Sequence, residues 1–149
     1  MRLVLQRVTR ASVTVDGAVV GSIGPGLVVL VGIGHEDTPA TVQALADRTC
    51  DLRIFRDPAG MTNLSLMDVG GEVLAISQFT LYADTRKGRR PSFLAAAPPD
   101  LGSALYATYA AAVEARGVRV ALGVFGAEMA VELVNDGPMT IWLDSAATA

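Results

Sequence analysis

Short apolar runs dominate the first part of the sequence and predict β strands. Four runs rich in Val, Leu and Ile follow one another: LVLQRV (3–8), SVTVDG (12–17), AVVGSI (18–23) and LVVLVGI (27–33). Asp16-Gly17 joins two of these runs and favours a tight hairpin, because glycine tolerates the positive φ that such turns need. Gly24-Pro25-Gly26 separates the next two. We therefore expect a meander of antiparallel strands.

Two later segments carry apolar residues at helical spacing. The first follows Thr38-Pro39, where an N-cap residue precedes a proline at the first helical position. The second follows Asp100, which we expect to cap it, and stops at Gly117. The predicted buried stripes are Val42, Leu45, Ala46, Thr49 and Leu52 in the first helix and Leu101, Leu105, Tyr109, Ala112 and Val113 in the second.

The remaining apolar segments read as strands. They are LRIF (52–55), EVLAISQFTLYA (72–83), VRVALG (118–123), AEMAVELVND (127–136) and PMTIWLD (138–144). The pattern predicts a single domain over residues 1–149 of the α+β class: a mostly antiparallel β-barrel or sheet with two main helices packed against it.

Composition agrees with a globular chain, since 51% of the residues are hydrophobic and 18% are charged. The one cysteine, Cys50, cannot form an internal disulfide and favours a reducing compartment. Arginines interrupt every apolar run near the start, which is typical neither of a signal peptide nor of a membrane span. We therefore expect a cytoplasmic protein without a membrane partner.

The charge distribution is uneven. The net charge is −3, which argues against coating nucleic acid through bulk charge. A third of the twelve Lys and Arg nevertheless lie within five positions, at Arg86, Lys87, Arg89 and Arg90. Such a run is usually a solvated surface loop, but it could also contact phosphates.

Conventional catalytic side chains are scarce. The only histidine, His35, lies in a loop without an evident partner, and Cys50 lies within a helical pattern. No cluster has the spacing of metal ligands and no glycine-rich phosphate loop occurs, so we expect neither metal nor cofactor. If the chain is an enzyme, main-chain groups or the substrate itself must carry much of the chemistry.

Two polar segments remain as candidates. In an ideal strand, Ser77 and Phe79 would point to one side, and Gln78 and Thr80 to the other. A polar, solvent-facing strand edge is the ordinary interpretation of this pattern. Asn135-Asp136-Gly137-Pro138 has the composition of a hairpin turn between two strands.

Taken together, these segments resemble those of the D-aminoacyl-tRNA deacylases, the D-tyrosyl-tRNA deacylase family. The resemblance rests on SQFTL (77–81), TRKGRRPSF (85–93), FGAEM (125–129) and NDGPMT (135–140), and the motifs QRVTRASVTVDG, GLVVLVG, LRIF and MTNLSL agree in order. Met139 stands where the family usually has valine, and Leu122 where threonine is common. The similarity covers nearly the whole chain.

This resemblance implies chiral proofreading: hydrolysis of the ester that joins a D-amino acid to the terminal adenosine of tRNA. It also implies a homodimer in which a cis Gly137-Pro138 element of one subunit, held by Arg7, enters the active site of the other. A fixed main chain can distinguish handedness because only the directions of the groups on the α-carbon differ. We expect L-aminoacyl-tRNA to be rejected by collision and glycyl-tRNA, which has no side chain, to be admitted.

For the chemistry we expect the segment Ser77–Thr80 to act mainly through its main chain. The N–H groups of Phe79 and Thr80 are candidates for stabilising the oxyanion, and Gln78 for hydrogen-bonding the ribose or positioning the ester. Thr80 lacks an adjacent base, so we favour water as the nucleophile, assisted by the ribose hydroxyl of the tRNA. Arg86, Lys87, Arg89 and Arg90 would contact phosphates near the acceptor end.

Two other functions remain compatible with the residues alone. A hydrolase of small esters or peptides would cleave a free D-amino-acid ester as well as the tRNA-linked one. A non-catalytic RNA-binding subunit would depend on the basic loop but not on Gly137 or Gln78.

Overall fold

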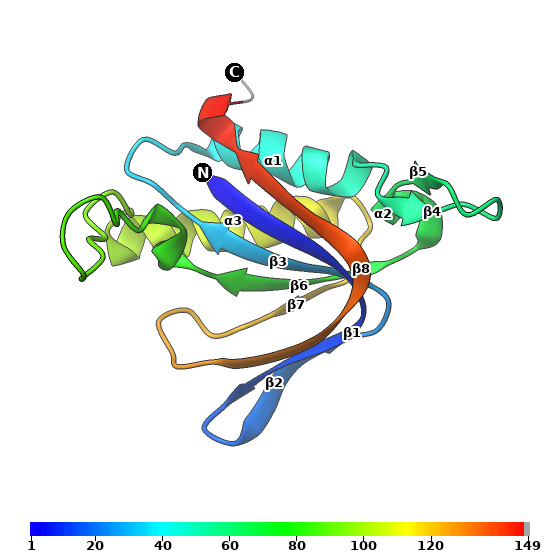
Figure 1. Ribbon diagram of the computed structural model, residues 1–149, viewed down its shortest axis with the longest axis horizontal. Helices are drawn as coiled ribbons and strands as arrows, with labels where there is room; N and C mark the ends of the chain where they lie inside the picture. The colour runs from blue at the N-terminus through cyan, green and yellow to red at the C-terminus, as the bar shows by residue number, and fades with distance from the viewer. Residues whose placement is uncertain (148–149) are drawn as a thin grey trace.

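The computed structural model describes residues 1–147, which fold into one α+β unit (Figure 1). The strands are β1 (Arg2–Val15), β2 (Ala18–Ile23), β3 (Gly26–Gly32), β4 (Phe55–Arg56), β5 (Thr62–Leu64), β6 (Glu72–Ser77), β7 (Val120–Leu122) and β8 (Ala130–Asp144). The helices are α1 (Pro39–Asp51), α2 (Leu66–Val69) and α3 (Pro99–Ala115), with 3₁₀ turns η1 (Phe79–Tyr82) and η2 (Ser145–Ala147).

Six strands form one curved sheet in the order β2-β1-β3-β6-β7, with β8 pairing along β1. β1 pairs in antiparallel fashion with β2, β3 and β8, whereas the pairs β3–β6 and β6–β7 are parallel. The expected α+β class is confirmed. The expected meander is wrong in its order, because β3 pairs with β1 and leaves β2 at the edge.

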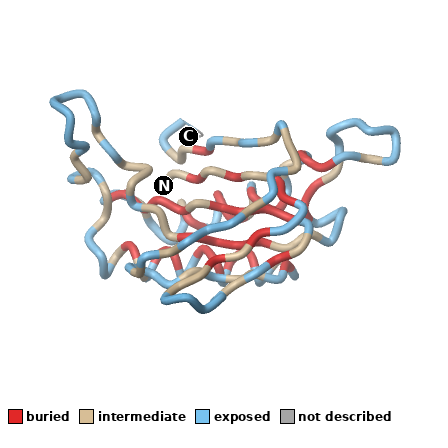
Figure 2. Tube along the Cα trace, turned by 60° about the horizontal axis from the view of Figure 1, so that its bottom comes forward, coloured by how far each residue is buried: buried red, intermediate tan, exposed pale blue. Residues whose placement is uncertain are grey.

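Apolar side chains fill both faces of the curved sheet. On one face, α1 and α3 cover a core that includes Leu5, Val29 and the fully buried Tyr109. On the other face, the outer half of β1 curls over a second cluster that includes Val13 and Ile76. Figure 2 shows the buried residues concentrated in the central strands, with exposed loops projecting at both ends.

The predicted helices are confirmed, one of them with a different start. The Thr38 hydroxyl accepts from the N–H of Thr41 and caps α1, as expected. Asp100 does not cap α3: Pro98 occupies the cap position, and Asp100 lies in the first turn, where its charge favours the helix dipole. α3 ends at Ala115, and Gly117, just beyond it, adopts the positive φ of +87° that glycine tolerates.

Several strand boundaries differ from the prediction. The runs at 3–8 and 12–17 form one long strand, β1, and the Asp16-Gly17 turn then leads into β2 as predicted. Of the run 52–55, only Phe55 lies in a strand, in the small ribbon β4–β5. A turn follows Arg56, closed by the hydrogen bond from Gly60 N–H to the Asp57 carbonyl.

The run 72–83 is not one strand. β6 ends at Ser77, and the next residues turn into η1, so the predicted alternation of side chains beyond Ser77 is wrong. Beyond Ser77, the parallel pairing of β6 with β3 continues for only one more hydrogen bond, from Gln78 N–H to the Val31 carbonyl at 2.7 Å.

The segment around Pro138 is not a hairpin turn either. β8 runs through it as one strand, and Gln6 pairs with Thr140 while Val8 pairs with Asn135. One β1 residue, Arg7, therefore faces the residues 136–139, which we call the 136–139 bulge. Because proline cannot donate a ladder hydrogen bond, a bulge is where a strand can hold it.

Candidate functional site

The η1 turn presents main-chain donors at the end of β6. The N–H groups of Phe79 and Thr80 begin the turn and so have no acceptor within it, and neither donates to another group of residues 1–147. The amide of Gln78 donates to the Thr80 hydroxyl. The backbone groups expected to stabilise an oxyanion are thus available, although in a turn and not in a strand.

Two contacts fix the position of η1. The guanidinium of Arg2 donates to the Leu81 carbonyl at 2.9 Å and lies 4.4 Å from the centre of the Tyr82 ring. The Phe79 ring, which is exposed, packs edge-on against Phe93 at 5.1 Å between centroids. The turn is therefore tied to β1 at its end and to the segment after the basic loop at its start.

A hollow of about 650 Å³ opens beside the end of η1. Its lining includes Gly34, Asp37, Tyr82 and Asp144. The Tyr82 hydroxyl donates to Asp37 at 3.4 Å, and burial raises the pKa of this phenol far above its usual value. Tyr82 is thus held protonated as a donor and is not suited to act as a base near neutral pH.

The 136–139 bulge contains a cis peptide bond between Gly137 and Pro138, as the resemblance implied. Pro138 is exposed, whereas Gly137 is partly covered. The Asn135 amide donates to the Arg7 carbonyl at 2.9 Å and to the Met139 carbonyl at 3.1 Å, and so bridges the base of the bulge. A Cβ on Gly137 would lie 2.5 Å from Oδ1 of Asn135, so this position is tightly fitted to glycine.

Arg7 lies beneath the bulge and is buried, with a side-chain exposure of 3%. Its Nε donates to the Asp136 carbonyl and pairs with the Asp136 carboxylate, each at 3.0 Å, and its terminal nitrogen donates to the Ile54 carbonyl. A buried guanidinium with all these partners is not the surface arginine that a β-strand position would ordinarily suggest.

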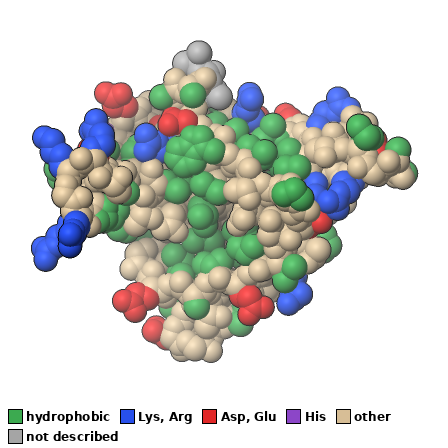
Figure 3. Space-filling view, viewed as in Figure 1, with side chains coloured by type: hydrophobic (Ala, Val, Ile, Leu, Met, Phe, Trp, Pro, Cys, Tyr) green, Lys and Arg blue, Asp and Glu red, His purple; other side chains and the backbone are tan. Residues whose placement is uncertain are grey.

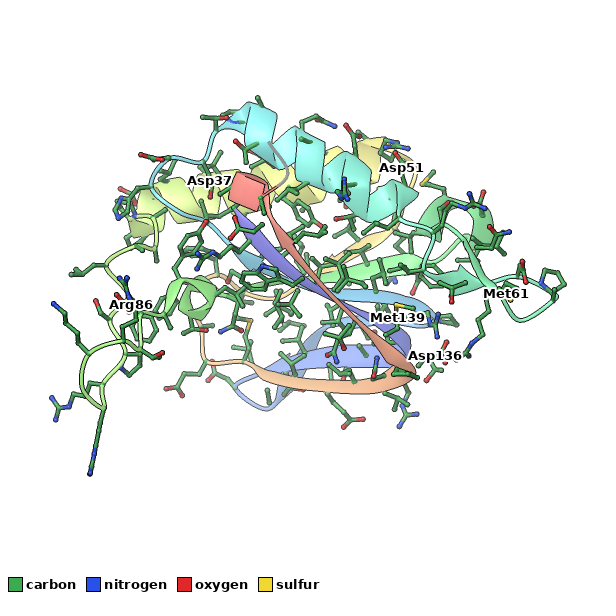
Figure 4. The ribbon with its side chains drawn as sticks, turned by 45° about the horizontal axis from the view of Figure 1, so that its top comes forward. Asp37, Asp51, Met61, Arg86, Asp136 and Met139 are labelled. Carbon is green, nitrogen blue, oxygen red and sulfur yellow. The ribbon has the colours of Figure 1, made fainter. Side chains whose placement is uncertain are left out.

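A second arginine reaches the bulge from β4. Arg56 donates to the Asp136 carboxylate at 3.2 Å and to the Gly137 carbonyl at 3.3 Å. The sequence did not single out Arg56, because an arginine next to a short apolar run has no distinctive spacing. Figure 4 shows Asp136 and Met139 near each other where β8 bends.

The η1 turn and the bulge lie far apart on the same chain. Arg2 holds η1 and Arg7 holds the bulge, and the five residue steps between them span about 17 Å of strand β1. The structure therefore does not bring Ser77–Thr80 together with Gly137-Pro138 within one subunit. In Figure 4, Arg86 lies on the left of the molecule and Asp136 well to its right.

The basic residues lie in an exposed loop closed by a bridge between Asp84 and Ser92. Arg86 makes two side-chain hydrogen bonds to the Asp84 carboxylate, at 2.9 and 2.7 Å, which lower the pKa of Asp84 to about 2. The charge of Arg86 is therefore compensated locally. For Lys87, Arg89 and Arg90 no such carboxylate partner occurs in residues 1–147.

Other chemistry finds little support in the described part of the chain. Residues 1–147 contain no cluster of His, Cys, Asp or Glu that could hold a metal ion. Cys50 is a buried core side chain, and its burial raises the pKa of the thiol to about 11. His35 is an exposed loop residue whose ring lies beside the Leu94 carbonyl. No helix in these residues is long and apolar enough to cross a bilayer.

Comparison with known proteins identifies the class. The sequence matches the D-Tyr-tRNA(Tyr) deacylase family over residues 4–144, and the chain belongs to this family of ester hydrolases. The recognition made from the motifs is thereby confirmed.

Particular relatives are similar over nearly their whole length. The D-aminoacyl-tRNA deacylase of Thermomicrobium roseum is 61% identical over 98% of this chain and 95% of its own. That of Deinococcus deserti is 58% identical over 97% of this chain and 99% of its own.

Two solved structures share the fold. The c-Myc DNA Unwinding Element Binding Protein has a TM-score of 0.90 and 40% identity, covering 97% of this chain and 98% of its own. A probable eukaryotic D-amino acid tRNA deacylase has a TM-score of 0.83 at 22% identity, covering 95% of this chain and 97% of its own, which is a likeness of fold alone.

Proposed function

We propose that this protein is a chiral proofreading enzyme of the cytoplasm that hydrolyses the ester of D-aminoacyl-tRNA and releases the free D-amino acid and the tRNA. The observation that carries the proposal is the Gly137-Pro138 pair with its exposed proline, held from below by the buried Arg7 in a chain of the deacylase family. A strand that bulges outward around a partly covered glycine and an exposed proline is suited to contact something outside its own subunit.

We further propose that the enzyme is a homodimer in which the 136–139 bulge of one subunit completes the site at Ser77–Thr80 of the other. The separation of about 17 Å along β1 supports this arrangement, because one chain cannot join the two parts. Apolar side chains also gather at the centre of the face in Figure 3. Trp142 on β8 is half exposed in the single chain, which favours burial against a second copy.

The main chain at Gly137 would distinguish D- from L-aminoacyl-tRNA. Gly137 has no Cβ, so its backbone can approach the α-carbon of the substrate closely. Arg7 and Asn135 hold the bulge in place, so it cannot move aside for an L side chain. Each tenfold of discrimination requires about 1.4 kcal/mol, which a steric collision exceeds readily. A filter of this kind admits glycyl-tRNA to some degree.

Bond cleavage would rely on the η1 turn. A water oxygen attacks the ester carbonyl carbon, and the N–H groups of Phe79 and Thr80 stabilise the oxygen that becomes negative. The ribose 2′-hydroxyl of the tRNA assists the attacking water. The intermediate then expels the 3′-oxygen of the terminal adenosine, which takes up the proton that the attacking water has given up. Gln78 positions the ribose, and Ser77 ends the strand that carries the turn.

The basic loop would bind the same tRNA near its acceptor end. Phosphate contacts contribute affinity without reading sequence, which suits an enzyme that acts on many tRNAs. Lys87, Arg89 and Arg90 are the strongest candidates, because the charge of Arg86 is already balanced by Asp84.

One assay separates this function from its alternatives. Purified protein is given one tRNA charged with D-tyrosine, L-tyrosine or glycine, and also free D-tyrosine ethyl ester. We expect rapid cleavage of the D-tyrosyl-tRNA, measurable cleavage of glycyl-tRNA and little of the other two. Equal turnover of the free ester would indicate a small-ester hydrolase, and binding without cleavage would indicate an RNA-binding subunit.

A further inference from the structure

The 136–139 bulge is held from two sides, and only one of them involves Arg7. On the buried side, the Arg7 guanidinium binds the Asp136 carbonyl and carboxylate. On the outer side, Arg56 binds the other carboxylate oxygen of Asp136 at 3.2 Å and the next carbonyl along the chain, that of Gly137, at 3.3 Å. Two successive carbonyls thus each accept from a different arginine, with the Asp136 carboxylate between them.

The segment that carries Arg56 is itself tied to the same arrangement. Arg7 donates to the Ile54 carbonyl, so the start of the β4–β5 ribbon and the bulge share one buried guanidinium. Arg56 therefore projects from a segment that is fixed relative to the bulge. Its planar fork can bind two acceptors at once, which a lysine ammonium cannot do with the same geometry.

We propose that Arg56 is a positioning residue for substrate selection, because it fixes the direction of the Gly137 carbonyl. This inference rests on the proposed function, in which the main chain of Gly137 approaches the α-carbon of the substrate in the partner subunit. With Arg56 in place the carbonyl cannot swing away, and the space open to an L side chain stays closed.

The exposure of Arg56 separates this role from a contribution to stability. Its side chain is 50% exposed, and exposed ion pairs contribute little to folding. Removing it should therefore leave the fold intact and alter the handling of substrates. A purely structural residue would instead lower stability and affect D- and L-substrates equally.

The test compares Arg56→Ala with Arg56→Lys and with the control Arg53→Ala. Arg53 lies on the same segment but donates to the Asn63 carbonyl within the ribbon, at 2.7 Å. We expect the ratio of L- to D-tyrosyl-tRNA cleavage, measured as kcat/KM, to rise about tenfold in Arg56→Ala, as for loss of a charge-assisted hydrogen bond. Arg56→Lys should give an intermediate ratio, and Arg53→Ala the wild-type ratio.

A second measurement does not depend on activity. Protein labelled with ¹³C at the glycine carbonyls reports the hydrogen bond at Gly137 by NMR, and we expect this resonance to shift in Arg56→Ala but not in Arg53→Ala. An unchanged resonance and an unchanged L/D ratio would each overturn the inference. If the wild-type protein cleaves no D-aminoacyl-tRNA while the resonance does shift, the contact exists and the proposed function is what fails.

Discussion

The guanidinium of Arg7 lies buried under the main chain of Asp136, with Nε 3.0 Å from the carbonyl oxygen. This contact joins β1 to the point where β8 leaves its ladder. It places a permanent charge, nearly inaccessible to water, directly against the residue that precedes Gly137.

Arg7→Ala should lower both stability and selectivity. The substitution removes hydrogen bonds from a charged donor to two carbonyls, each worth about 1.5–3 kcal/mol, and leaves the buried Ile54 carbonyl without this donor. We expect the free energy of unfolding in urea to fall by about 3 kcal/mol. Arg10→Ala, at an exposed neighbouring position on β1, is the control and should change it by less than about 0.5 kcal/mol. Equal effects of the two substitutions would contradict the assigned contacts.

Gly137→Ala should abolish cleavage without unfolding the protein. A Cβ here would press on the Asn135 amide and would occupy the space proposed for the substrate. Gly24→Ala is a matched control, since the nearest atom to its added Cβ is 3.9 Å away. We expect kcat/KM on D-tyrosyl-tRNA to fall at least about 100-fold for the first variant and to stay unchanged for the second.

The same variant tests whether the site is shared between subunits. Gln78→Ala and Gly137→Ala proteins, each inactive alone, are unfolded together and refolded as a mixture. In a two-fold dimer, half of the products are mixed and one of their two sites is intact, so about a quarter of the wild-type activity should return. No recovery at all would exclude the cross-subunit arrangement.

Thr80→Ala should retain appreciable activity, because the proposed role of this residue belongs to its N–H group. Substrate ending in 2′-deoxyadenosine should react poorly with the wild-type enzyme, since it lacks the hydroxyl that assists the water. Both are measured as single-turnover rates with the same D-amino acid. An inactive Thr80→Ala together with normal cleavage of the deoxy substrate would make the threonine hydroxyl the nucleophile.

Replacing both Arg89 and Arg90 with glutamine should weaken the binding of all tRNAs to a similar extent. Each lost phosphate contact should reduce the slope of log K against log salt concentration by about 0.7–0.9. Arg86→Gln should have a smaller effect, because its guanidinium is already bound by Asp84. Titrations of two different tRNAs at several salt concentrations measure this, and a loss confined to one tRNA would argue for sequence-specific recognition.

Alkaline pH should destabilise the fold through Tyr109. This phenol is fully buried and hydrogen-bonded to Thr49 at 2.9 Å, and burial raises its pKa far above its usual value of about 10. Above pH 10 the unfolded chain loses this proton while the folded protein keeps it, so stability is full below that pH and falls as pH rises. The expected slope is about 1.4 kcal/mol per pH unit for this group. Urea unfolding between pH 8 and 11 should show a shallower slope for Tyr109→Phe.

Local signals in the sequence were sufficient for the elements that depend on local chemistry. Thr38 caps α1 and Asp16-Gly17 turns β1 into β2, because such caps and turns are decided by a few neighbouring residues. The order of the strands was not accessible in this way. Whether β3 pairs with β1 or with β2 depends on long-range packing. The apolar runs of the three strands are too alike to predict which two of them pair.

The candidate site illustrates the same limit. Gln78 and Gly137 were found because their motifs resemble a family, but the turn at Phe79 was predicted as strand, since the apolar run continues unbroken through it. The hairpin predicted at Asn135 was wrong because turn-forming residues also suit a bulge. Arg56 escaped notice because its partner lies 80 positions along the chain.

The pairing of β1 with β8 also has a consequence for biosynthesis. β1 is translated well before its partner strand β8, which ends at Asp144. Such distant pairing slows folding, because a long loop must close before the contacts form. On the ribosome, the edge of β1 that pairs with β8 thus stays unpaired until β8 has been synthesised. Because β1 is synthesised long before β8, we expect the chain to depend on chaperones during its synthesis and not after it has folded.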